Sequence, residues 1–463
     1  MKPYELTLSA AAKEIEARRL SPVELTDSVL SRIDAVDGAL HAFACVTADL
    51  AQTAAKAAEQ YIAAGHYLGA LHGIPLGVKD LYNTAGVPTT SSSQVRADYV
   101  PDTDALVVER LLAAGMVMVG KTHTHEFAYG PITPTTRNPW DTGRIPGGSS
   151  GGSGAAVAAG ACMVGLGSDT AGSIRIPASL CGTVGLKPTY GRVSRRGVAS
   201  LSWSLDHVGP LTRNVRDAAL VLNTIAGHDR LDPASVDVPV PDYTAGLNDG
   251  IAGLRVGVPS NYYFEHVHDD VAAAVRAAIN VLEGLGADLR EVTIPYADAI
   301  MPSEWAILLP EASAYHQESL RHKGDLYGAD VRLFLETGEL ILATDYIKAL
   351  RVRTLMQQAW AAMFDDIDVL AAPCVPSVAP EVGARDIVWA DGTTEDITSA
   401  LVRLPSPGNL IGLPTLALPV GFDPAGLPLG MQVLGRPFDE ATVLRVGHAY
   451  EMASDSVGRL APV

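Results

Sequence analysis

Residues 147–153 read Gly-Gly-Ser-Ser-Gly-Gly-Ser, and residues 167–177 read Gly-Ser-Asp-Thr-Ala-Gly-Ser-Ile-Arg-Ile-Pro. These stretches carry the serines Ser149 and Ser173, and Lys79 lies upstream, directly after the uncharged run Gly-Ile-Pro-Leu-Gly-Val. A hydroxyl is a weak nucleophile until a base removes its proton, and a lysine that burial keeps neutral can be that base. The pattern therefore predicts a hydrolase site made of two serines and one lysine.

The composition of the chain excludes several classes of protein. Its 463 residues are 48% hydrophobic and 19% charged, which is typical of a compact globular protein rather than a disordered one. The net charge is −18 and the only Lys/Arg cluster is at 192–196, so nucleic acid is not an expected ligand. Four widely spaced cysteines form no C-x-x-C pair, which predicts buried thiols.

The sequence also predicts a protein without a membrane partner. The N-terminal residues lack the long apolar run of a signal peptide. The most apolar stretch, 155–167, is too short and too rich in glycine to span a bilayer of roughly 30 Å. We therefore expect a cytoplasmic protein.

Short apolar runs recur beside stretches of helical periodicity, which predicts an α/β sheet. Strands are expected at 116–119, 163–166, 254–258, 369–372, 415–418 and 431–434. Ser21-Pro22-Val23-Glu24 fits a capping box and predicts a helix to about Ile33. A second helix is expected over 270–285, with its apolar stripe against the sheet, formed by Val271, Val275, Ile279 and Leu282. Residues 229–243 are the candidate exposed connection.

The glycines at 147–152 precede an Ala-rich helix former, 153–161. Backbone N–H groups and the helix dipole at such an N-terminus disfavour a nearby ammonium and would help to neutralise Lys79. Small residues at 170–173 would let consecutive N–H groups converge on a developing oxyanion. Each feature alone has a simpler interpretation: 147–153 as a flexible linker, 169–172 as a tight turn, and Lys79 as a solvated surface lysine.

Four segments taken together resemble the amidase signature family. They are Gly-Val-Lys-Asp at 77–80, Pro-Gly-Gly-Ser-Ser-Gly-Gly at 146–152, residues 167–175, and Gly-Leu-Lys-Pro-Thr-Tyr-Gly-Arg-Val-Ser at 185–194. The likeness runs from about residue 5 to 455 and includes 409–414 and 426–432. It implies one α/β/α domain over 1–463, with a large mixed, mostly parallel, twisted sheet covered by helices on both faces. A helical segment would occupy about 1–65, the signature core about 66–215, and the rest of the sheet and the pocket elements about 216–463.

The resemblance also implies a role for each residue of the catalytic set. Ser173 would be the nucleophile, Ser149 the bridging serine after a cis peptide bond, and Lys79 the base. Lys79 would draw a proton from Ser149, which draws one from Ser173 as Ser173 attacks the amide carbonyl. Ser149 would then protonate the departing amine, and water would cleave the acyl-enzyme. The backbone amides of Thr170, Ala171, Gly172 and Ser173 would form the oxyanion hole.

The expected partners are a small-molecule amide and water, with no metal and no organic cofactor, and relatives often form homodimers. Ala171 stands where many relatives have glycine, so its methyl group is expected to narrow the pocket. Asp169 and Arg175 are expected to hold the loop rather than to touch substrate. The candidate residues lining the substrate pocket are His125, Phe127, Tyr129, Ile132, Trp305 and Leu309.

Two further interpretations involve a different hydrolase class. Residues 147–151 also match G-x-S-x-G, a nucleophile elbow in which Ser149 would attack with Asp206 and His207 as partners. An elbow follows a strand, and 138–146 is a poor strand. His123 and His125 follow an expected strand and could seed a metal-dependent hydrolase, although no additional ligand set is identifiable.

The remaining alternative is the glutamine-hydrolysing A subunit of a tRNA-dependent amidotransferase, which shares the catalytic set. That subgroup typically has an Arg-Tyr-Asp-Gly-type segment after Glu-Ala-Ser, here 311–313, and an acid ahead of the Asn-Leu motif. This chain has Ala-Tyr-His-Gln at 314–317 and Val-Arg-Leu-Pro at 402–405. We therefore expect a stand-alone amidase for a small or medium, fairly apolar amide, with anilides and carbamates as candidates. The intact serines and lysine disfavour a non-catalytic binding module.

Overall fold

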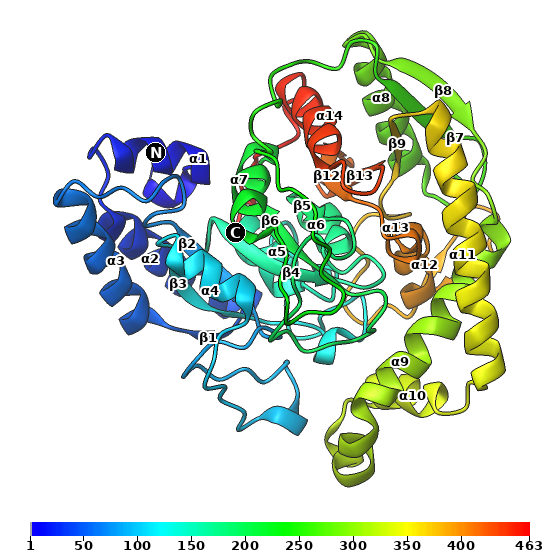
Figure 1. Cartoon of the computed structure of the whole chain (residues 1–463), viewed down its shortest axis with the longest axis horizontal. Coiled ribbons are helices and arrows are strands. Elements are labelled where there is room, and N and C mark those ends of the chain that lie inside the picture. Colours follow the sequence, from blue (N-terminus) through cyan, green and yellow to red (C-terminus); the bar gives the residue numbers. More distant parts are fainter. Residues whose placement is uncertain (1) are drawn as a thin grey trace.

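The computed structural model describes residues 2–463, and its centre is an 11-stranded sheet (Figure 1). The strand order is β1-β3-β2-β4-β6-β5-β12-β13-β9-β7-β8. These strands are β1 (Phe43–Val46), β2 (Pro75–Lys79), β3 (Val117–Thr122), β4 (Val164–Asp169), β5 (Val184–Lys187), β6 (His207–Thr212), β7 (Arg255–Pro259), β8 (Asp288–Val292), β9 (Val369–Pro373), β12 (Thr415–Phe422) and β13 (Pro428–Gly435). A separate antiparallel pair joins β10 (Asp386–Val388) and β11 (Thr394–Asp396).

The sheet is mixed, as expected, but the expectation that it is mostly parallel is wrong. Among the described strands, β3-β2, β2-β4, β9-β7 and β7-β8 are parallel neighbours. The other six neighbouring pairs are antiparallel. Parallel neighbours need a long crossover, whereas β12 runs directly into β13 through the turn at 423–427, which permits only an antiparallel pair. A short apolar run in the sequence does not reveal this direction.

Helices cover both faces of the sheet, as expected. They are α1 (Leu8–Glu16), α2 (Pro22–Leu40), α3 (Ala48–Ala63), α4 (Leu106–Ala113), α5 (Gly151–Ala158), α6 (Arg175–Cys181), α7 (Val215–Ile225), α8 (Asp269–Gly284), α9 (Ile300–Lys323), α10 (Ala329–Gly338), α11 (Ala343–Asp366), α12 (Ile397–Arg403), α13 (Ser406–Ile411) and α14 (Glu440–Met452). Gly185 of β5 faces α6, where a Cβ would lie 2.7 Å from Ala178. The next residue, Leu186, pairs with Leu416, which packs on Gly447 of α14. Since successive strand residues point to opposite faces, α6 and α14 cover opposite faces.

The strands and helices expected from the sequence are present, but several begin or end a few residues from the expected positions. All six expected strands occur. The helix that begins at Pro22 has the expected capping box and continues past Ile33 to Leu40. The four apolar residues of the α8 stripe are buried, as predicted. Residues 229–243 form no helix or strand and are largely exposed.

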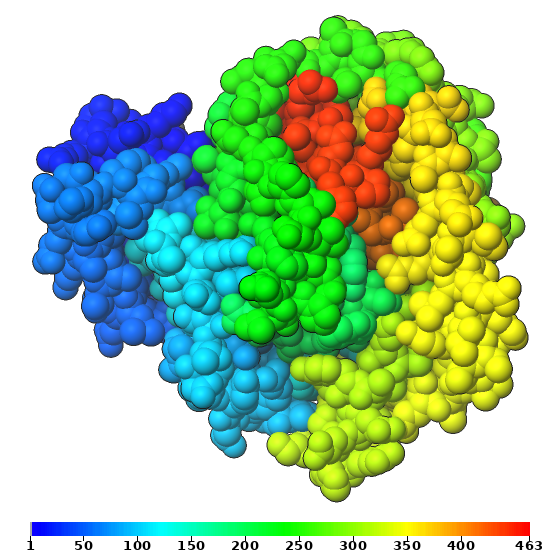
Figure 2. Space-filling view, in the orientation of Figure 1, coloured from blue at the N-terminus to red at the C-terminus, as the bar shows by residue number. Residues whose placement is uncertain are grey.

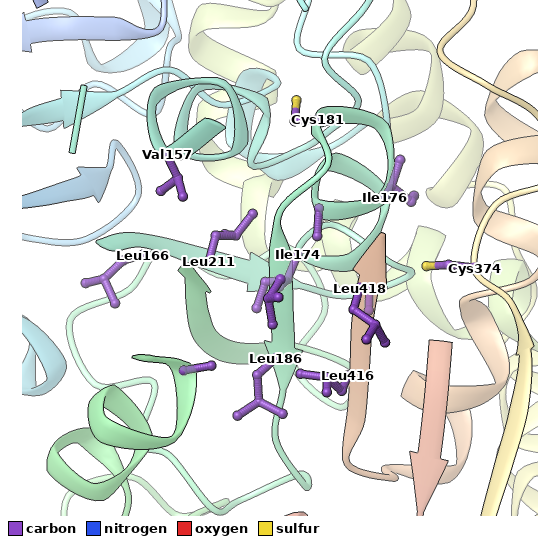
Figure 3. Packing of buried hydrophobic residues seen from close by; sticks show 14 of the residues in the cluster. Val157, Leu166, Ile174, Ile176, Cys181, Leu186, Leu211, Cys374, Leu416 and Leu418 are labelled. Carbon is purple, nitrogen blue, oxygen red and sulfur yellow. The ribbon is translucent and has the colours of Figure 1, made fainter. Parts of the chain in front are cut away.

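One hydrophobic core connects the central strands with their covering helices. Figure 3 shows side chains of α5, α6, β4, β5, β6 and β12 meeting there, among them Val157, Leu166, Ile174, Leu186, Leu211 and Leu416, all of them buried. In Figure 2 the N-terminal segment and helices α9–α11 lie on opposite sides of the segment that carries the site. We propose that the chain is one domain, because a single sheet and a single core run through it.

The cysteine and membrane expectations have direct structural counterparts. All four cysteines are free thiols; Cys162, Cys181 and Cys374 are buried as predicted, whereas Cys45 on the edge strand β1 is only half-buried. Within residues 2–463, no helix combines the length and the apolar character that a membrane crossing requires.

Candidate active site

The candidate site lies at the carboxyl ends of parallel strands. Strand β2 is parallel to both β3 and β4, so Lys79 at the end of β2 and Ser168 near the end of β4 reach the same edge of the sheet. Strand β6 runs antiparallel to β4 and begins at His207, opposite Asp169, which brings Asp206 to this edge. Ligands of open α/β sheets generally bind outside the carboxyl ends of the strands.

Lys79 is completely buried, and its amine lies among three hydroxyl groups. The Nζ atom is 2.7 Å from Ser149 Oγ, 2.8 Å from Ser150 Oγ and 2.9 Å from Ser168 Oγ. Burial lowers the pKa of Lys79 well below its ordinary value, although the charges of Asp169 and Asp206 act in the opposite direction. The site therefore favours the neutral amine, which is the form that can accept a proton.

The hydrogen bonds of Ser150 indicate how this amine is oriented. The Ser150 hydroxyl donates to the backbone carbonyl of Ser168 at 3.3 Å, so it accepts from Lys79. A neutral primary amine has two N–H bonds and one lone pair. If the N–H bonds are directed to Ser150 and Ser168, the lone pair faces the hydroxyl of Ser149.

The glycines around Ser149 allow close packing and do not form a linker. The peptide bond between Gly148 and Ser149 is cis, as the resemblance implied. At Gly152, in the first turn of α5, a Cβ would lie 2.5 Å from the Ala42 carbonyl oxygen and 2.6 Å from the His123 nitrogen. Such approaches are closer than real Cβ atoms make, so any side chain would push α5 away from its neighbours.

Ser173 lies two residues before α6 begins and is 7% exposed. The Ser150 N–H donates to the Ser173 carbonyl at 3.1 Å, which holds the two serine segments together. Within residues 2–463 no hydrogen bond joins Ser149 Oγ to Ser173 Oγ. The structure therefore brings the Lys79 amine to Ser149 and the Ser173 segment to its neighbour Ser150. Catalytic hydrogen bonds often form fully only when substrate is bound.

The loop 170–173 offers fewer free amides than the sequence predicts. The Gly172 N–H donates to Asp169 Oδ1 at 2.8 Å, so it is already occupied. The N–H groups of Thr170, Ala171 and Ser173 have no acceptor in the part of the chain that the structure describes. Three of the four predicted amides are therefore available to a developing oxyanion.

Asp169 and Arg175 hold this loop, as expected. Both side chains are fully buried and form a bidentate pair, with Nε 3.0 Å from Oδ2 and NH2 3.0 Å from Oδ1. Asp169 also accepts the N–H groups of Gly172 and Ile174. Burial alone would raise the pKa of Asp169, but the charge and hydrogen bonds of Arg175 and its neighbours lower it overall.

Asp206 is a second carboxylate at the site and is half-buried, although the sequence suggested it only as a partner in a nucleophile elbow. Its oxygens accept the Thr170 hydroxyl at 2.7 Å and the Ser200 hydroxyl at 2.7 Å. They also accept the N–H groups of Leu201 and Ser202, both at 3.0 Å. Burial raises the pKa of Asp206, while these donors favour its charged form.

The other hydrolase arrangements do not match this geometry. His207 Nδ1 donates to the Leu205 carbonyl at 2.6 Å rather than to Asp206, and Ser149 meets Lys79, so no elbow triad forms. His123 Nδ1 is 3.0 Å from Ser92 Oγ, and His125 Nε2 is 3.0 Å from Asp330 Oδ2. The two rings thus face different partners. Among the described residues, no group of three or more His, Cys, Asp or Glu side chains is placed to hold a metal ion.

A cavity of about 30 Å³ lies beside Ser173 and the loop that precedes it. Of the six predicted lining residues, Tyr129 and Trp305 line it. Leu309 does not, but the preceding residue on α9, Leu308, does. Ala171 is also among the lining residues of this cavity.

The other three predicted lining residues are placed elsewhere. His125 forms a hydrogen bond with Asp330, and the Ile132 N–H donates to His125 Nδ1 at 3.4 Å. Phe127 packs edge-on against His316, with ring centroids 4.5 Å apart. The sequence analysis missed Phe334 of α10 and Val402 of α12, which complete the cavity. No local signal marks them, because these helices are far from the motifs in the sequence.

A second, larger cavity of about 130 Å³ adjoins the first. Ser168, Asp206 and His207 line it, together with residues from the loop 195–203. Ala128 and Leu201 line both cavities, so the two are neighbours across these residues. The sequence analysis did not identify this loop as part of the site.

Comparisons with known proteins agree with this geometry. The model of the amidase family, described as Amidase, matches residues 24–444. An amidase of Pseudomonas putida is 53% identical over 97% of this chain and 96% of its own. The A subunit of the glutamyl-tRNA(Gln) amidotransferase of Chloroflexus aggregans is 44% identical over 98% and 97%. The crystal structure of a bacterial aryl acylamidase of the amidase signature enzymes superposes with a TM-score of 0.88, at 28% identity, over 97% and 96% of the two chains. The chain therefore belongs to the amidase signature family and is an amidase.

Proposed function

We propose that this amidase cleaves its substrate through an acyl-enzyme on Ser173, with Ser149 and neutral Lys79 moving the protons. The observation that carries the proposal is the buried amine of Lys79, 2.7 Å from Ser149 Oγ. A buried lysine that is charged normally pairs with a carboxylate. The Lys79 amine contacts three hydroxyl groups instead, which suits the neutral form that a general base needs. Each proton step of this kind typically contributes roughly 10² to 10⁴-fold to the rate.

Acylation begins with the amide carbonyl carbon next to Ser173 Oγ. As the C–O bond forms, the Ser173 proton passes to Ser149, and the Ser149 proton passes to Lys79. The carbonyl oxygen becomes an oxyanion, which the N–H groups of Thr170, Ala171 and Ser173 stabilise. The C–N bond then breaks, Ser149 protonates the leaving amine, and the lysine ammonium restores the proton to Ser149.

Deacylation uses the same groups with water as the nucleophile. Ser149 accepts a proton from water as the water attacks the ester carbonyl, and Lys79 again receives a proton from Ser149. Collapse of the second oxyanion breaks the ester bond, and Ser173 leaves with a proton from Ser149. The products are a carboxylic acid and an amine, and Lys79 returns to its neutral form.

The substrate class we propose is a small or medium, largely apolar amide, with anilides and carbamates as the leading candidates. The cavity beside Ser173 is bordered by aromatic and aliphatic side chains and by no charged one within residues 2–463. An ionised group placed there would lose its hydration without gaining a partner. The similarity to an aryl acylamidase supports the anilide candidate.

A second candidate function is the glutaminase of a tRNA-dependent amidotransferase, because relatives at 44% identity carry that name. Glutamine brings an α-ammonium and an α-carboxylate, and both need charged or polar partners near the site. The uncharged lining of the cavity beside Ser173 therefore favours the stand-alone amidase.

The experiment that separates the two is a substrate screen with the purified protein alone. Aryl and aliphatic amides, carbamates and esters are compared with glutamine by the release of amine, alcohol or ammonia. We expect turnover of neutral amides without a partner protein, and glutamine to be a poor substrate. Glutamine hydrolysis that exceeds turnover of every neutral amide would contradict the proposal.

A further inference from the structure

We propose that the two adjoining cavities divide the substrate, so that the cavity beside Ser173 takes a short acyl group and the larger cavity takes the aromatic ring of an arylamine leaving group. The preferred substrate class is then a short-chain N-aryl amide. This inference rests on the proposed function, because it requires that Ser173 attacks an amide. It adds the direction in which the amide lies across the site.

The smaller cavity is assigned to the acyl side by the groups that surround the carbonyl. Thr170, Ala171 and Ser173 all line it, so a carbonyl held by their N–H groups directs its acyl chain into this space. Its wall is a row of rings, with the centroid of Phe334 5.3 Å from that of Tyr129 and 6.1 Å from that of Trp305.

The volume of the smaller cavity limits the acyl chain. At about 30 Å³, it offers little space around the carbonyl. A cavity needs roughly 10–15 Å³ of such space to hold one water molecule, so this one takes about two. The rings of Tyr129, Phe334 and Trp305 pack against one another, so extending the chain requires this row to move. The geometry therefore favours an acetyl-sized group over a ring on the acyl side.

The larger cavity is assigned to the amine side by its position next to the proton relay. Ser168 lines it, and the same Ser168 hydroxyl is 2.9 Å from Lys79 Nζ. The leaving nitrogen must face Ser149, which is bonded to this lysine, because Ser149 supplies the proton that releases the amine. A substituent on that nitrogen therefore extends towards the cavity bordered by Ser168.

The size of the larger cavity matches one aromatic ring. Its volume is about 130 Å³. An engineered apolar cavity of roughly 150 Å³ in another protein binds benzene. Much of the lining is aliphatic, contributed by Val198, Ala199, Val208, Leu231 and Pro233.

The charged residues of the larger cavity are already paired, which favours a neutral occupant. The Arg195 guanidinium lies 5.3 Å from the ring centroid of Trp203 and 3.9 Å from Asp232. Asp206 accepts four hydrogen bonds. An arylamine is largely neutral at physiological pH, unlike an alkylamine, and it would not disturb these pairs. Trp203 is 58% exposed at the mouth and can pack against a substituent of the ring.

Hydrogen bonds to Asp206 fix the position of the two cavities relative to each other. Leu201 lines both, and its N–H is held by Asp206 at 3.0 Å. The same carboxylate holds the hydroxyl of Thr170 at the start of the oxyanion loop. The boundary between the compartments and the groups that bind the carbonyl therefore share one anchor, which fixes where the C–N bond lies.

The test uses acetanilide and phenylacetamide, which are isomers that carry the same ring on opposite sides of the amide. The measured quantity is the ratio of their kcat/KM values, acetanilide over phenylacetamide, in the wild-type protein and two variants. Ala199→Leu fills the larger cavity, and Leu308→Ala enlarges the smaller one. The exposed residue Ala343, at the start of α11, lines neither cavity and provides a matched control, Ala343→Leu.

We expect the wild-type ratio to exceed one. Ala199→Leu should lower it by about tenfold or more, the usual cost of one misfitting group in a fitted pocket, and Leu308→Ala should lower it by admitting the ring on the acyl side. Ala343→Leu should leave it unchanged. A wild-type ratio below one, or a ratio that Ala199→Leu raises or leaves unchanged, overturns the assignment of the cavities. Circular dichroism confirms that each variant is folded.

Failure of the proposed function has a different signature. If the wild-type protein hydrolyses neither isomer nor any other neutral amide, the proposed function fails and the cavity assignment fails with it. If amides are hydrolysed and the ratio behaves otherwise than expected, only the assignment of the two cavities is wrong.

Discussion

Asp206 Oδ1 accepts the hydroxyl of Thr170 at 2.7 Å, which joins the loop after residue 199 to the first residue of the oxyanion loop. Asp206 is half-buried. Burial lowers the pKa of Lys79, and the negative charge of Asp206 offsets part of that effect. Asp206 therefore acts on the oxyanion loop through its hydrogen bond to Thr170, and on the base Lys79 through its charge.

Replacing Asp206 by asparagine should shift the pH dependence of kcat/KM. The negative charge of Asp206 stabilises the ammonium form of Lys79, so its removal lowers the pKa of Lys79 further. The neutral amine then persists to lower pH, and the acidic limb of the profile moves to lower pH. Asp98→Asn, at an exposed position, should leave the limb in place. A limb that moves to higher pH in Asp206→Asn would contradict this role.

The wild-type profile itself should have an acidic limb that belongs to Lys79. The pKa of this lysine lies well below 10.5, so activity should rise with pH through that pKa as the amine loses its proton, and level off above it. Steady-state kinetics with a neutral amide, measured from about pH 5 to about pH 9, give the profile of kcat/KM, which reports the ionisations of the free enzyme. A flat profile would argue against lysine as the base.

Lys79→Met should lower the acylation rate by about 10² to 10⁴-fold, because the base is lost while the buried volume is kept. Lys187 provides a matched control: it is also fully buried, and burial also lowers its pKa, but its amine donates to the carbonyls of Pro188 and Leu413. A folded Lys187→Met protein should retain the acidic limb of the profile. Stopped-flow measurement of the first turnover reports acylation directly.

Gly152→Ala should destabilise the protein, and Gly38→Ala should not. A Cβ at Gly152 would lie 2.5 Å from a backbone oxygen of Ala42, whereas nothing lies within 4 Å of a Cβ at Gly38 in α2. Alanine is favoured over glycine in a helix by about 0.5–1 kcal/mol, so Gly38→Ala should be slightly stabilising. Thermal unfolding followed by circular dichroism compares the two; equal midpoints would show that the close approach at Gly152 has no energetic cost.

Arg175→Met should destabilise the fold strongly, by about 3–5 kcal/mol, because it leaves the carboxylate of Asp169 buried without its cation. The double variant Arg175→Met/Asp169→Asn should be less destabilised, since the unpaired charge is gone. The folded-state pKa of Asp169 is below its unfolded value. The stability that the pair contributes is therefore complete above the unfolded pKa and is lost as pH falls through the folded one. Urea unfolding at several pH values tests both statements.

The sequence predicted the elements that local patterns determine. The capping box at Ser21 located the start of α2, and the apolar spacing of Val271 and Val275 located α8 and its buried face. The glycine-rich serine segment correctly indicated a helix start, and it lies next to Lys79. Each of these depends on neighbours within a few positions in the chain.

What the sequence could not supply depends on contacts between distant segments. Strand direction across the sheet follows from the connections, so the antiparallel centre was missed. The pocket is completed by Phe334 and Val402, which the fold brings to Ser173 from helices that carry no motif. The small residues at 170–173 predicted four free amides, but the N–H of Gly172 donates to the side-chain oxygen Oδ1 of Asp169 and is not free.

The central claim is that Ser173 forms the covalent intermediate, and fluorophosphonate labelling tests it most directly. The wild-type protein, Ser173→Ala and Ser149→Ala are treated with the same probe, and the labelled peptide is identified by mass spectrometry. The account predicts a single adduct on Ser173 in the wild-type protein, slower labelling of Ser173 in Ser149→Ala, and none in Ser173→Ala. An adduct on Ser149 or at any other position in Ser173→Ala, formed at the wild-type rate, would contradict it.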